Sequence, residues 1–212
     1  MDKRFCIFDM DGTLADSMPF WVRLGREYLE GLGLRPTAAQ LAQTDTMTME
    51  ESAAYFHETF AIPDPPEKIF ADMYGVMGRH YRRDVPLKAG VLDYLRALKA
   101  RGARLGVATA TEAAVSRACM ERLGVWEYLD FLLSCETLGV GKTRPDIYLE
   151  AAARLGAAPG ETAVFEDSLY ALKTAKAAGF YTVAVAEPAY AADWNALSAL
   201  ADETITDWRN AI

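Results

Sequence analysis

The stretch FCIFDMDGTLADS, from Phe5 to Ser17, decides how this chain folds. Its first four residues, Phe5 to Phe8, are apolar or nearly so and predict a buried strand. Two carboxylates, Asp9 and Asp11, follow at once, and Gly12 lets the backbone turn sharply as it leaves the strand. Acidic groups so close together repel each other, so their place at the end of a buried strand needs a chemical reason.

Metal-assisted phosphoryl chemistry supplies such a reason. A carboxylate can attack phosphorus and form an aspartyl-phosphate, provided that it stays ionised and can approach an anion. A Mg²⁺ ion meets both conditions, because it neutralises charge and bridges the nucleophile and a phosphoryl oxygen. The second carboxylate can then reach the leaving-group oxygen and act as general acid, and afterwards as general base.

Five apolar runs predict the strands of one sheet. They are residues 4–9, 104–109, 131–136, 162–167 and 181–187, and they are continuous rather than alternating, which is typical of strands buried on both faces of a parallel sheet. Helical patterns, each ending at a glycine, lie between most of these runs. We therefore predict an α/β fold with a doubly wound, mainly parallel sheet. Ligands of such sheets bind beyond the carboxyl ends of the strands. The polar residues expected there are Asp9, Thr109, Glu136, Glu166 and Asp167.

A helical segment interrupts this alternation after the first strand. Trp21, Leu24, Tyr28 and Leu32 fall on one helix face, and Thr48–Glu51 has the pattern of a capping box that opens a helix through Phe60. Pro65–Pro66 opens a third helix toward Arg82. We therefore predict a catalytic core made of residues 1–15 and 87–212, with a small all-helical cap domain at residues 16–86.

Length, charge and cysteine content narrow the class of protein. The 212 residues suffice for one packed core and a modest second domain. The net charge of −8 argues against nucleic-acid binding. The first apolar run is too short for a signal peptide or a membrane span, and three scattered cysteines fit a reducing compartment. We expect a cytoplasmic monomer that binds neither nucleic acid nor membranes.

Four motifs of the chain resemble those of a known family. DMDGTLADS closely resembles the first motif of the haloacid dehalogenase-like (HAD) hydrolases, and Thr109 in GVATAT resembles the second. Lys142 in GVGKTRPDIY is similar to the third motif, and FEDSLYALKTAKAAG is similar to the fourth. The resemblance covers nearly the whole chain, including a helical cap between the first two motifs, and it implies a Rossmann-like core.

The resemblance implies a role for each motif residue. Asp9 is the expected nucleophile and Asp11 the expected acid/base, while Thr109, Ala110 and Lys142 are expected to bind the phosphoryl group. The expected cofactor is Mg²⁺. The ligands implied for it are Asp9, Asp11 through its backbone carbonyl, Asp167, and Glu166 directly or through water. Two departures from the family pattern, Thr143 and Ala171–Leu172, concern loop geometry more than chemistry.

The expected function is Mg²⁺-dependent hydrolysis of a small phosphorylated metabolite. Dehalogenase and phosphonate-cleaving relatives lack the second acid, so Asp11 argues against them. One alternative is a sugar phosphomutase like β-phosphoglucomutase, which carries a histidine where we align Trp21 and an arginine where we align Met49. Another is a binding or regulatory protein that kept the fold without catalysis. Sugar phosphates, small phosphorylated acids and nucleotide monophosphates all remain open as substrates.

Overall fold

The computed structural model describes residues 3–211 and divides the chain into two compact units. The core unit comprises residues 1–18 and 85–212, and the helical unit comprises residues 19–84. We propose that they correspond to the catalytic core and the cap expected from the sequence. Residues 1, 2 and 212 of the expected core lie outside the described residues.

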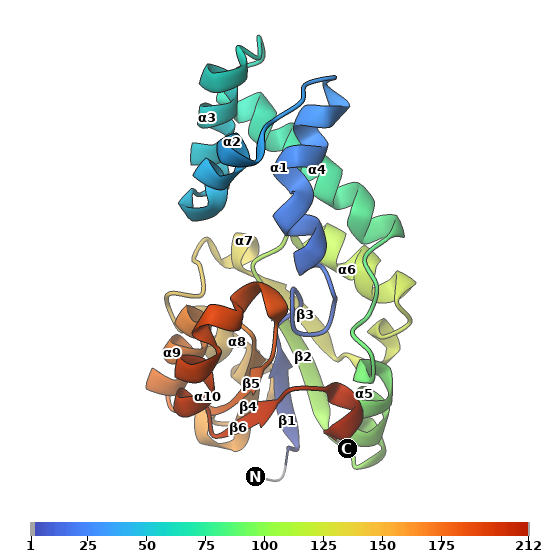
Figure 1. Ribbon diagram of the computed structural model, residues 1–212. Coiled ribbons are helices and arrows are strands. Elements are labelled where there is room, and N and C mark those ends of the chain that lie inside the picture. Colours follow the sequence, from blue (N-terminus) through green and yellow to red (C-terminus); the bar gives the residue numbers. More distant parts are fainter. Residues whose placement is uncertain (1–2, 212) are drawn as a thin grey trace. The chain divides into compact units, whose positions relative to one another are not determined.

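The core unit is built on one six-stranded sheet in which every paired strand is parallel (Figure 1). The strand order is β3-β2-β1-β4-β5-β6. The bounds are β1 Phe5–Phe8, β2 Arg104–Thr109, β3 Phe131–Ser134, β4 Thr162–Glu166, β5 Tyr181–Val185 and β6 Glu203–Ile205. This arrangement confirms the predicted doubly wound α/β fold.

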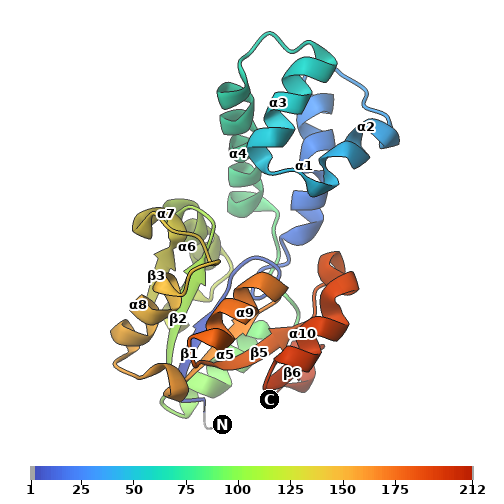
Figure 2. The ribbon, with the colours of Figure 1, turned by 90° about the vertical axis from the view of Figure 1, so that its left-hand side faces the viewer.

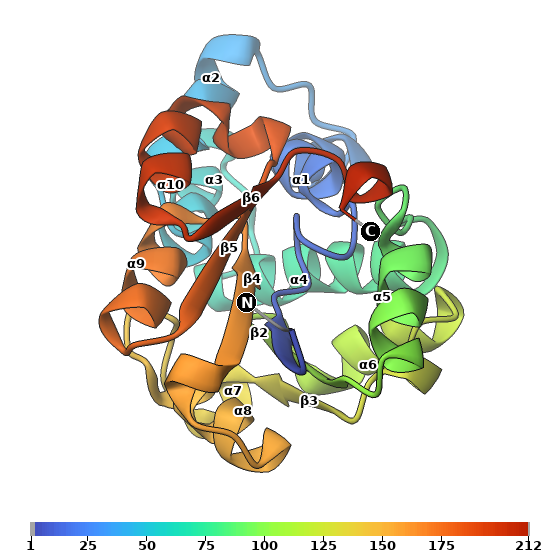
Figure 3. The same ribbon diagram turned by 90° about the horizontal axis from the view of Figure 1, so that it is seen from below.

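Helices cover both faces of the sheet (Figure 3). One face carries α8 (Asp146–Leu155), α9 (Leu169–Ala177) and α10 (Trp194–Leu200), and the other carries α5 (Val91–Ala100) and α6 (Ala113–Arg122). The remaining helical segments of the core unit are short: α7 Cys135–Leu138, η2 Trp126–Tyr128, η3 Pro159–Glu161, η4 Pro188–Asp193 and η5 Trp208–Asn210.

Neighbouring residues of β1 serve opposite faces of the sheet, as the strand period requires. Ile7 belongs to the apolar cluster that includes Tyr148 of α8. Phe8 instead stacks on Phe165 of β4, with ring centroids 4.4 Å apart, and both rings lie beside Trp208. Burial on both sides explains why the run before Asp9 is continuously apolar.

The helical unit contains α1 (Met18–Gly31) apart from its first residue, together with α2 (Ala38–Ala42), η1 (Gln43–Thr46), α3 (Met49–Phe60) and α4 (Pro66–Arg83). Helix α3 lies beside α4 (Figure 2). The predicted capping box is present, because the Thr48 hydroxyl accepts from the Glu51 amide and the Glu51 carboxylate accepts from the Thr48 amide. Leu24 and Tyr28 are buried on the predicted face of α1, whereas Leu32 lies beyond the helix end and is exposed.

Two features of the sheet differ from the sequence prediction. β3 ends at Ser134, whose hydroxyl accepts from the Glu136 amide and opens α7, so Glu136 stands in a helix rather than at a strand end. β6 was not predicted, because its three residues are too few and too polar to form an apolar run. No helix among residues 3–211 combines the length and the apolar character that crossing a membrane requires.

Candidate active site

Three buried carboxylates meet where β1 and β4 end. Asp9, Glu166 and Asp167 each offer an oxygen, and these oxygens all lie within 4.8 Å of one another. The parallel register explains the meeting: Phe8 pairs with Phe165, and the Asp9 amide donates to the Phe165 carbonyl at 2.9 Å. The first and fourth sequence motifs are thus adjacent in space although more than a hundred and fifty residues separate them.

Lys142 brings the third motif into the same cluster. Its side chain is 3% exposed, and its ammonium group donates to Asp9 and, at 2.7 Å, to Oε1 of Glu166. Burial alone would lower the pKa of Lys142, but the carboxylates of Asp9 and Glu166 outweigh burial and raise that pKa well above its usual value. Lys142 therefore stays charged inside the cluster.

The single ammonium group of Lys142 does not neutralise the three carboxylates of the cluster. Burial raises the pKa of Asp9 to about 7 against the opposing effect of Lys142, and burial together with the charges of Asp9 and Glu166 raises the pKa of Asp167 to about 9. Oδ2 of Asp9 and Oδ2 of Asp167 are buried and have no hydrogen-bond partner among the described residues. Buried carboxylate oxygens without partners are costly, and hard oxygen donors suit Mg²⁺. The residues present therefore fit a divalent cation.

Gly12 is required by this geometry. Its φ is +81°, in the region that favours glycine, and a Cβ at this position would lie only 2.0 Å from Oδ2 of Asp167. The glycine thus lets the loop after β1 approach the acidic pair of the fourth motif. The sequence predicted only that Gly12 allows a sharp turn, whereas the structure also requires that this residue has no side chain.

Asp11 lies apart from the three-carboxylate cluster and is held by two hydroxyl groups. Ser17 donates to Oδ1 and Thr111 donates to Oδ2, each at 2.7 Å. Thr111 is itself fixed, because its carbonyl accepts from the Ser134 hydroxyl at 2.8 Å. Hydroxyl groups on the loops after β1 and β2 therefore help to orient the side chain of Asp11.

Thr109 is fully buried at the end of β2, the neighbour of β1 in the sheet. Its hydroxyl accepts from the Thr111 amide at 3.0 Å. The N-cap position of α6 is held by Glu112 and not by Thr109, so the Thr109 side chain does not cap that helix. Ala110, the other expected phosphate-binding residue on this loop, is exposed.

Several residues of the site were not found by sequence reasoning. Thr111 and Ser17 hold Asp11, and Tyr148 and Ser168 donate to Glu166. Thr111 and Ser168 lie in the same loops as motif residues, so their position in the sequence could have indicated that they belong to the site. Tyr148 carried no such signal, because its contact depends on how α8 packs on the sheet.

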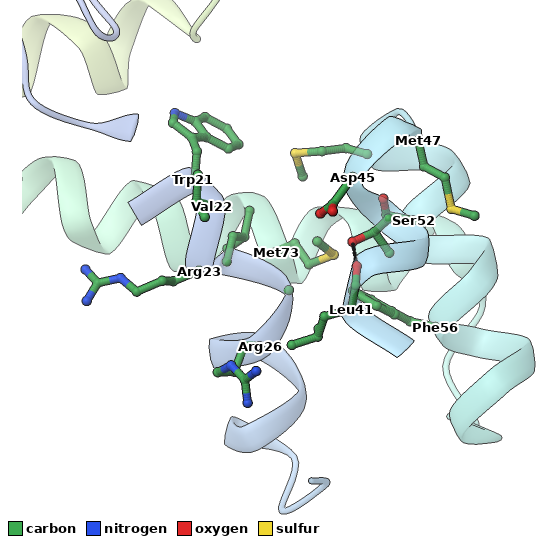
Figure 4. Close-up of a pocket in the computed structure, with 14 residues that line it drawn as sticks. Trp21, Val22, Arg23, Arg26, Leu41, Asp45, Met47, Ser52, Phe56 and Met73 are labelled. Atoms are coloured by element: carbon green, nitrogen blue, oxygen red, sulfur yellow. Dashed lines mark hydrogen bonds between the residues drawn. The ribbon is translucent and has the colours of Figure 1, made fainter. Parts of the chain in front are cut away.

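The helical unit carries a pocket of its own, with a volume of about 400 Å³ (Figure 4). Apolar and thioether side chains make much of its lining, namely Trp21, Leu41, Met47, Met49, Phe56 and Met73. Figure 4 shows the carboxylate of Asp45 directed toward the space beside α1, while Arg23 and Arg26 extend away from it. These arginines have other partners: Arg23 donates to the Pro19 carbonyl, and Arg26 pairs with Glu30 at 3.6 Å.

The chain is similar to several known phosphatases. The chain is 29% identical to the fructose-1-phosphate phosphatase YqaB of Escherichia coli K12, over 84% of this chain and 94% of that one. It is 28% identical to the phosphorylated carbohydrates phosphatase of Thermotoga maritima, over 82% and 80%. A solved structure from Thermotoga maritima, of a protein to which β-phosphoglucomutase activity is ascribed, superposes with a TM-score of 0.84 at 25% identity, covering 98% and 97% of the two chains.

A family model settles the wider assignment. The model of the haloacid dehalogenase-like hydrolases matches residues 3–179, which include all four motifs. Together with the phosphatases above, this match confirms the enzyme class expected from the sequence, a phosphoric monoester hydrolase. The chain belongs to the haloacid dehalogenase-like hydrolase family.

Proposed function

We propose that this protein is a Mg²⁺-dependent phosphatase that hydrolyses a small phosphomonoester through an aspartyl-phosphate on Asp9, with Asp11 as general acid and base. One observation carries the proposal. Asp9 is buried beside Lys142 and two further carboxylates, yet one of its oxygens has no hydrogen-bond partner among the described residues. A structural aspartate would be satisfied there, whereas a nucleophile must keep an oxygen available.

The residues that would hold Mg²⁺ are Asp9, Glu166 and Asp167, with the backbone carbonyl of Asp11 added by the family resemblance. When bound, the cation neutralises charge between the nucleophile and the phosphoryl oxygens. Lys142 supplies further positive charge beside Asp9, where charge shifts during transfer.

The side chains divide the reaction into two steps. In the first, a carboxylate oxygen of Asp9 forms a bond to phosphorus, the bond from phosphorus to the leaving-group oxygen breaks, and Asp11 gives that oxygen a proton. In the second, a water oxygen forms a bond to phosphorus, Asp11 takes a proton from the water, and the bond from phosphorus to the Asp9 oxygen breaks, which releases phosphate and regenerates Asp9. Ser17 and Thr111 keep the carboxylate of Asp11 in one orientation for both transfers.

We propose further that the pocket of the helical unit takes part in substrate choice. Its lining places one carboxylate, Asp45, among thioether and aromatic side chains, and its two arginines are directed elsewhere. Such a lining favours a neutral, hydroxyl-bearing leaving group over one with a second anion. The relatives named for fructose-1-phosphate and phosphorylated carbohydrates support this class.

The two alternatives receive less support. Trp21 donates its indole N–H to the Tyr81 hydroxyl, and Met49 lines the pocket. Neither side chain can transfer a proton or bind a phosphate group, as the histidine and arginine expected at these positions of a mutase would. A non-catalytic protein would have no use for the buried carboxylates that lack partners.

The proposal is tested by measuring phosphate release from a panel of monophosphates and bisphosphates. Activity should need Mg²⁺, disappear in excess chelator and return when Mg²⁺ is added. Phosphorus NMR of a sugar 1-phosphate would separate free phosphate, the expected product, from a sugar 6-phosphate, the product of a mutase. Full activity in excess chelator, or no turnover of any substrate, would contradict the proposal.

A further inference from the structure

The two oxygens of Glu166 are used unequally. Oε1 accepts from Lys142 and from the Tyr148 hydroxyl, each at 2.7 Å. Among the described residues, Oε2 accepts a hydrogen bond only from the Ser168 hydroxyl, at 3.3 Å. Because each carboxylate oxygen has about two lone-pair sites, Oε1 is saturated and Oε2 keeps the capacity to bind something else.

The side chain of Tyr148 is held in a fixed position by its surroundings, so its hydroxyl donates to the same oxygen of Glu166. Its side chain is fully buried in the first turn of α8, within the apolar cluster on that face of the sheet. Its ring lies edge-on to Phe180, with centroids 6.1 Å apart and planes inclined by 61°. The hydroxyl therefore reaches Glu166 from a fixed position, and its donation costs little additional side-chain entropy.

We propose that Tyr148 is a positioning residue for the metal: by occupying Oε1, its hydroxyl holds Glu166 so that Oε2 faces the divalent cation. This inference rests on the proposed function only in taking the cluster to be a metal site. In this role Tyr148 acts through Glu166, to which its hydroxyl donates, and not by binding the metal itself.

Lys142 alone cannot do the same. Its ammonium group is shared with Asp9, and without Tyr148 the only other donor to Glu166 described here is the Ser168 hydroxyl, at the longer distance of 3.3 Å. The hydroxyl adds a second donor from a different element, so the carboxylate is fixed from two directions. Loss of an outer partner of a metal ligand typically lowers metal affinity by about 10- to 100-fold.

The test is Mg²⁺ binding to the full-length metal-free protein, measured by calorimetry and repeated with Mn²⁺ by electron paramagnetic resonance. Tyr148→Phe keeps the ring and removes only the hydroxyl, and we expect its Mg²⁺ affinity to fall by about tenfold or more. At saturating Mg²⁺, kcat should stay within about threefold of wild type, because Tyr148 contacts no reacting atom.

The matched control is Tyr94→Phe. Tyr94 is also buried in the core unit, but its hydroxyl has no hydrogen-bond partner among the described residues. Its removal should change Mg²⁺ affinity by less than about twofold. A double-mutant cycle provides a second readout: in a Glu166→Gln background, Tyr148→Phe should cause little further loss of affinity, because the residue through which it acts is already altered.

The outcomes separate this inference from the proposed function. Equal Mg²⁺ affinity in wild type and Tyr148→Phe would overturn the positioning role while leaving the phosphatase proposal intact. An undiminished loss in the Glu166→Gln background would overturn it as well, because Tyr148 would then act by another route. Absence of Mg²⁺ and Mn²⁺ binding by the wild type would overturn both.

Discussion

The ammonium group of Lys142 lies 2.7 Å from Oε1 of Glu166, and both residues are buried. The same group also donates to Asp9. The cluster therefore holds one ammonium group and three carboxylates, which leaves a formal charge of −2 when all are ionised. A divalent cation has the charge that would balance this remainder.

Replacing Asp9 by asparagine should abolish turnover while the fold persists, because the two side chains have nearly the same volume. The metal-free variant should be as stable as the metal-free wild type, or more stable, at about pH 8, since burial raises the pKa of Asp9 to about 7 and disfavours its charge there. Thermal melts and phosphate release check both parts. Asp93→Asn, an exposed change on α5, serves as the control. Retention of a substantial fraction of the wild-type rate would place the nucleophile elsewhere.

The stabilisation given by Mg²⁺ should grow as the pH rises. The folded-state pKa values of Asp9 and Asp167, about 7 and about 9, exceed the usual value of 3.8. The stability contributed by their protonated forms is therefore fully present below about pH 4 and is lost as pH rises through 7 and then 9. Mg²⁺ binds the ionised forms and restores the lost stability.

Melting temperatures with and without Mg²⁺, measured from about pH 5.5 to about pH 9, check this prediction. Asp167→Asn should flatten the pH dependence of the metal-free protein. A shift in melting temperature that is the same at both ends of the range would show that the carboxylates do not titrate in the way described.

Much of the core unit could be predicted because its strands are buried on both faces and are therefore continuously apolar. Asp9 and Glu166–Asp167 stand directly after such runs, so their meeting follows from parallel pairing alone. β6 could not be predicted, because a short edge strand needs little apolar sequence. Glu136 was misplaced because the Ser134 hydroxyl ends the strand two residues early by starting a helix.

The partners of the motif residues were harder to predict than the motif residues themselves. Whether Ser17 and Thr111 turn toward Asp11 depends on loop conformation, and whether Tyr148 reaches Glu166 depends on the packing of α8. These are tertiary properties that periodicity and propensity do not encode.

Gly12→Ala should weaken Mg²⁺ binding and lower stability, because the added methyl group would collide with Oδ2 of Asp167. Gly102→Ala is the matched control, since its φ of +78° is nearly the same and nothing lies within 4 Å of its Cβ. The control should show only the cost of a left-handed backbone, about 1–2 kcal/mol. Calorimetric Mg²⁺ titration of both variants makes the comparison, and equal Mg²⁺ affinities would rule out the collision.

Asp11→Asn should reduce kcat by on the order of 10²–10⁴-fold, the usual contribution of general acid–base catalysis. The loss should shrink for a nitrophenyl phosphate, because its leaving group needs no proton. Thr111→Val should cause a smaller loss in the same direction, since it removes one of the two hydroxyl groups that orient Asp11. The control is Thr13→Val, whose hydroxyl is buried without a partner among the described residues. Equal losses for good and poor leaving groups would exclude the acid role.

Asp45→Asn should relax the discrimination against anionic leaving groups. The carboxylate of Asp45 lines the pocket of the helical unit, and repulsion from a second anion at about 4 Å in a watery pocket is worth about 1 kcal/mol. The ratio of kcat/KM for a phosphorylated acid to that for a polyol phosphate should therefore rise about fivefold. The rise should diminish at high salt, because an exposed charge is screened.

The control for Asp45 is Glu58→Gln, which removes an exposed carboxylate from α3 of the same unit at a position outside the pocket lining. Both variants change the net charge by the same amount, so a general electrostatic effect would alter their ratios equally. A shift confined to Asp45→Asn would support selection by the pocket itself. An unchanged ratio in Asp45→Asn, with activity otherwise intact, would mean that the substrate does not meet this pocket and that its leaving group is chosen by other side chains.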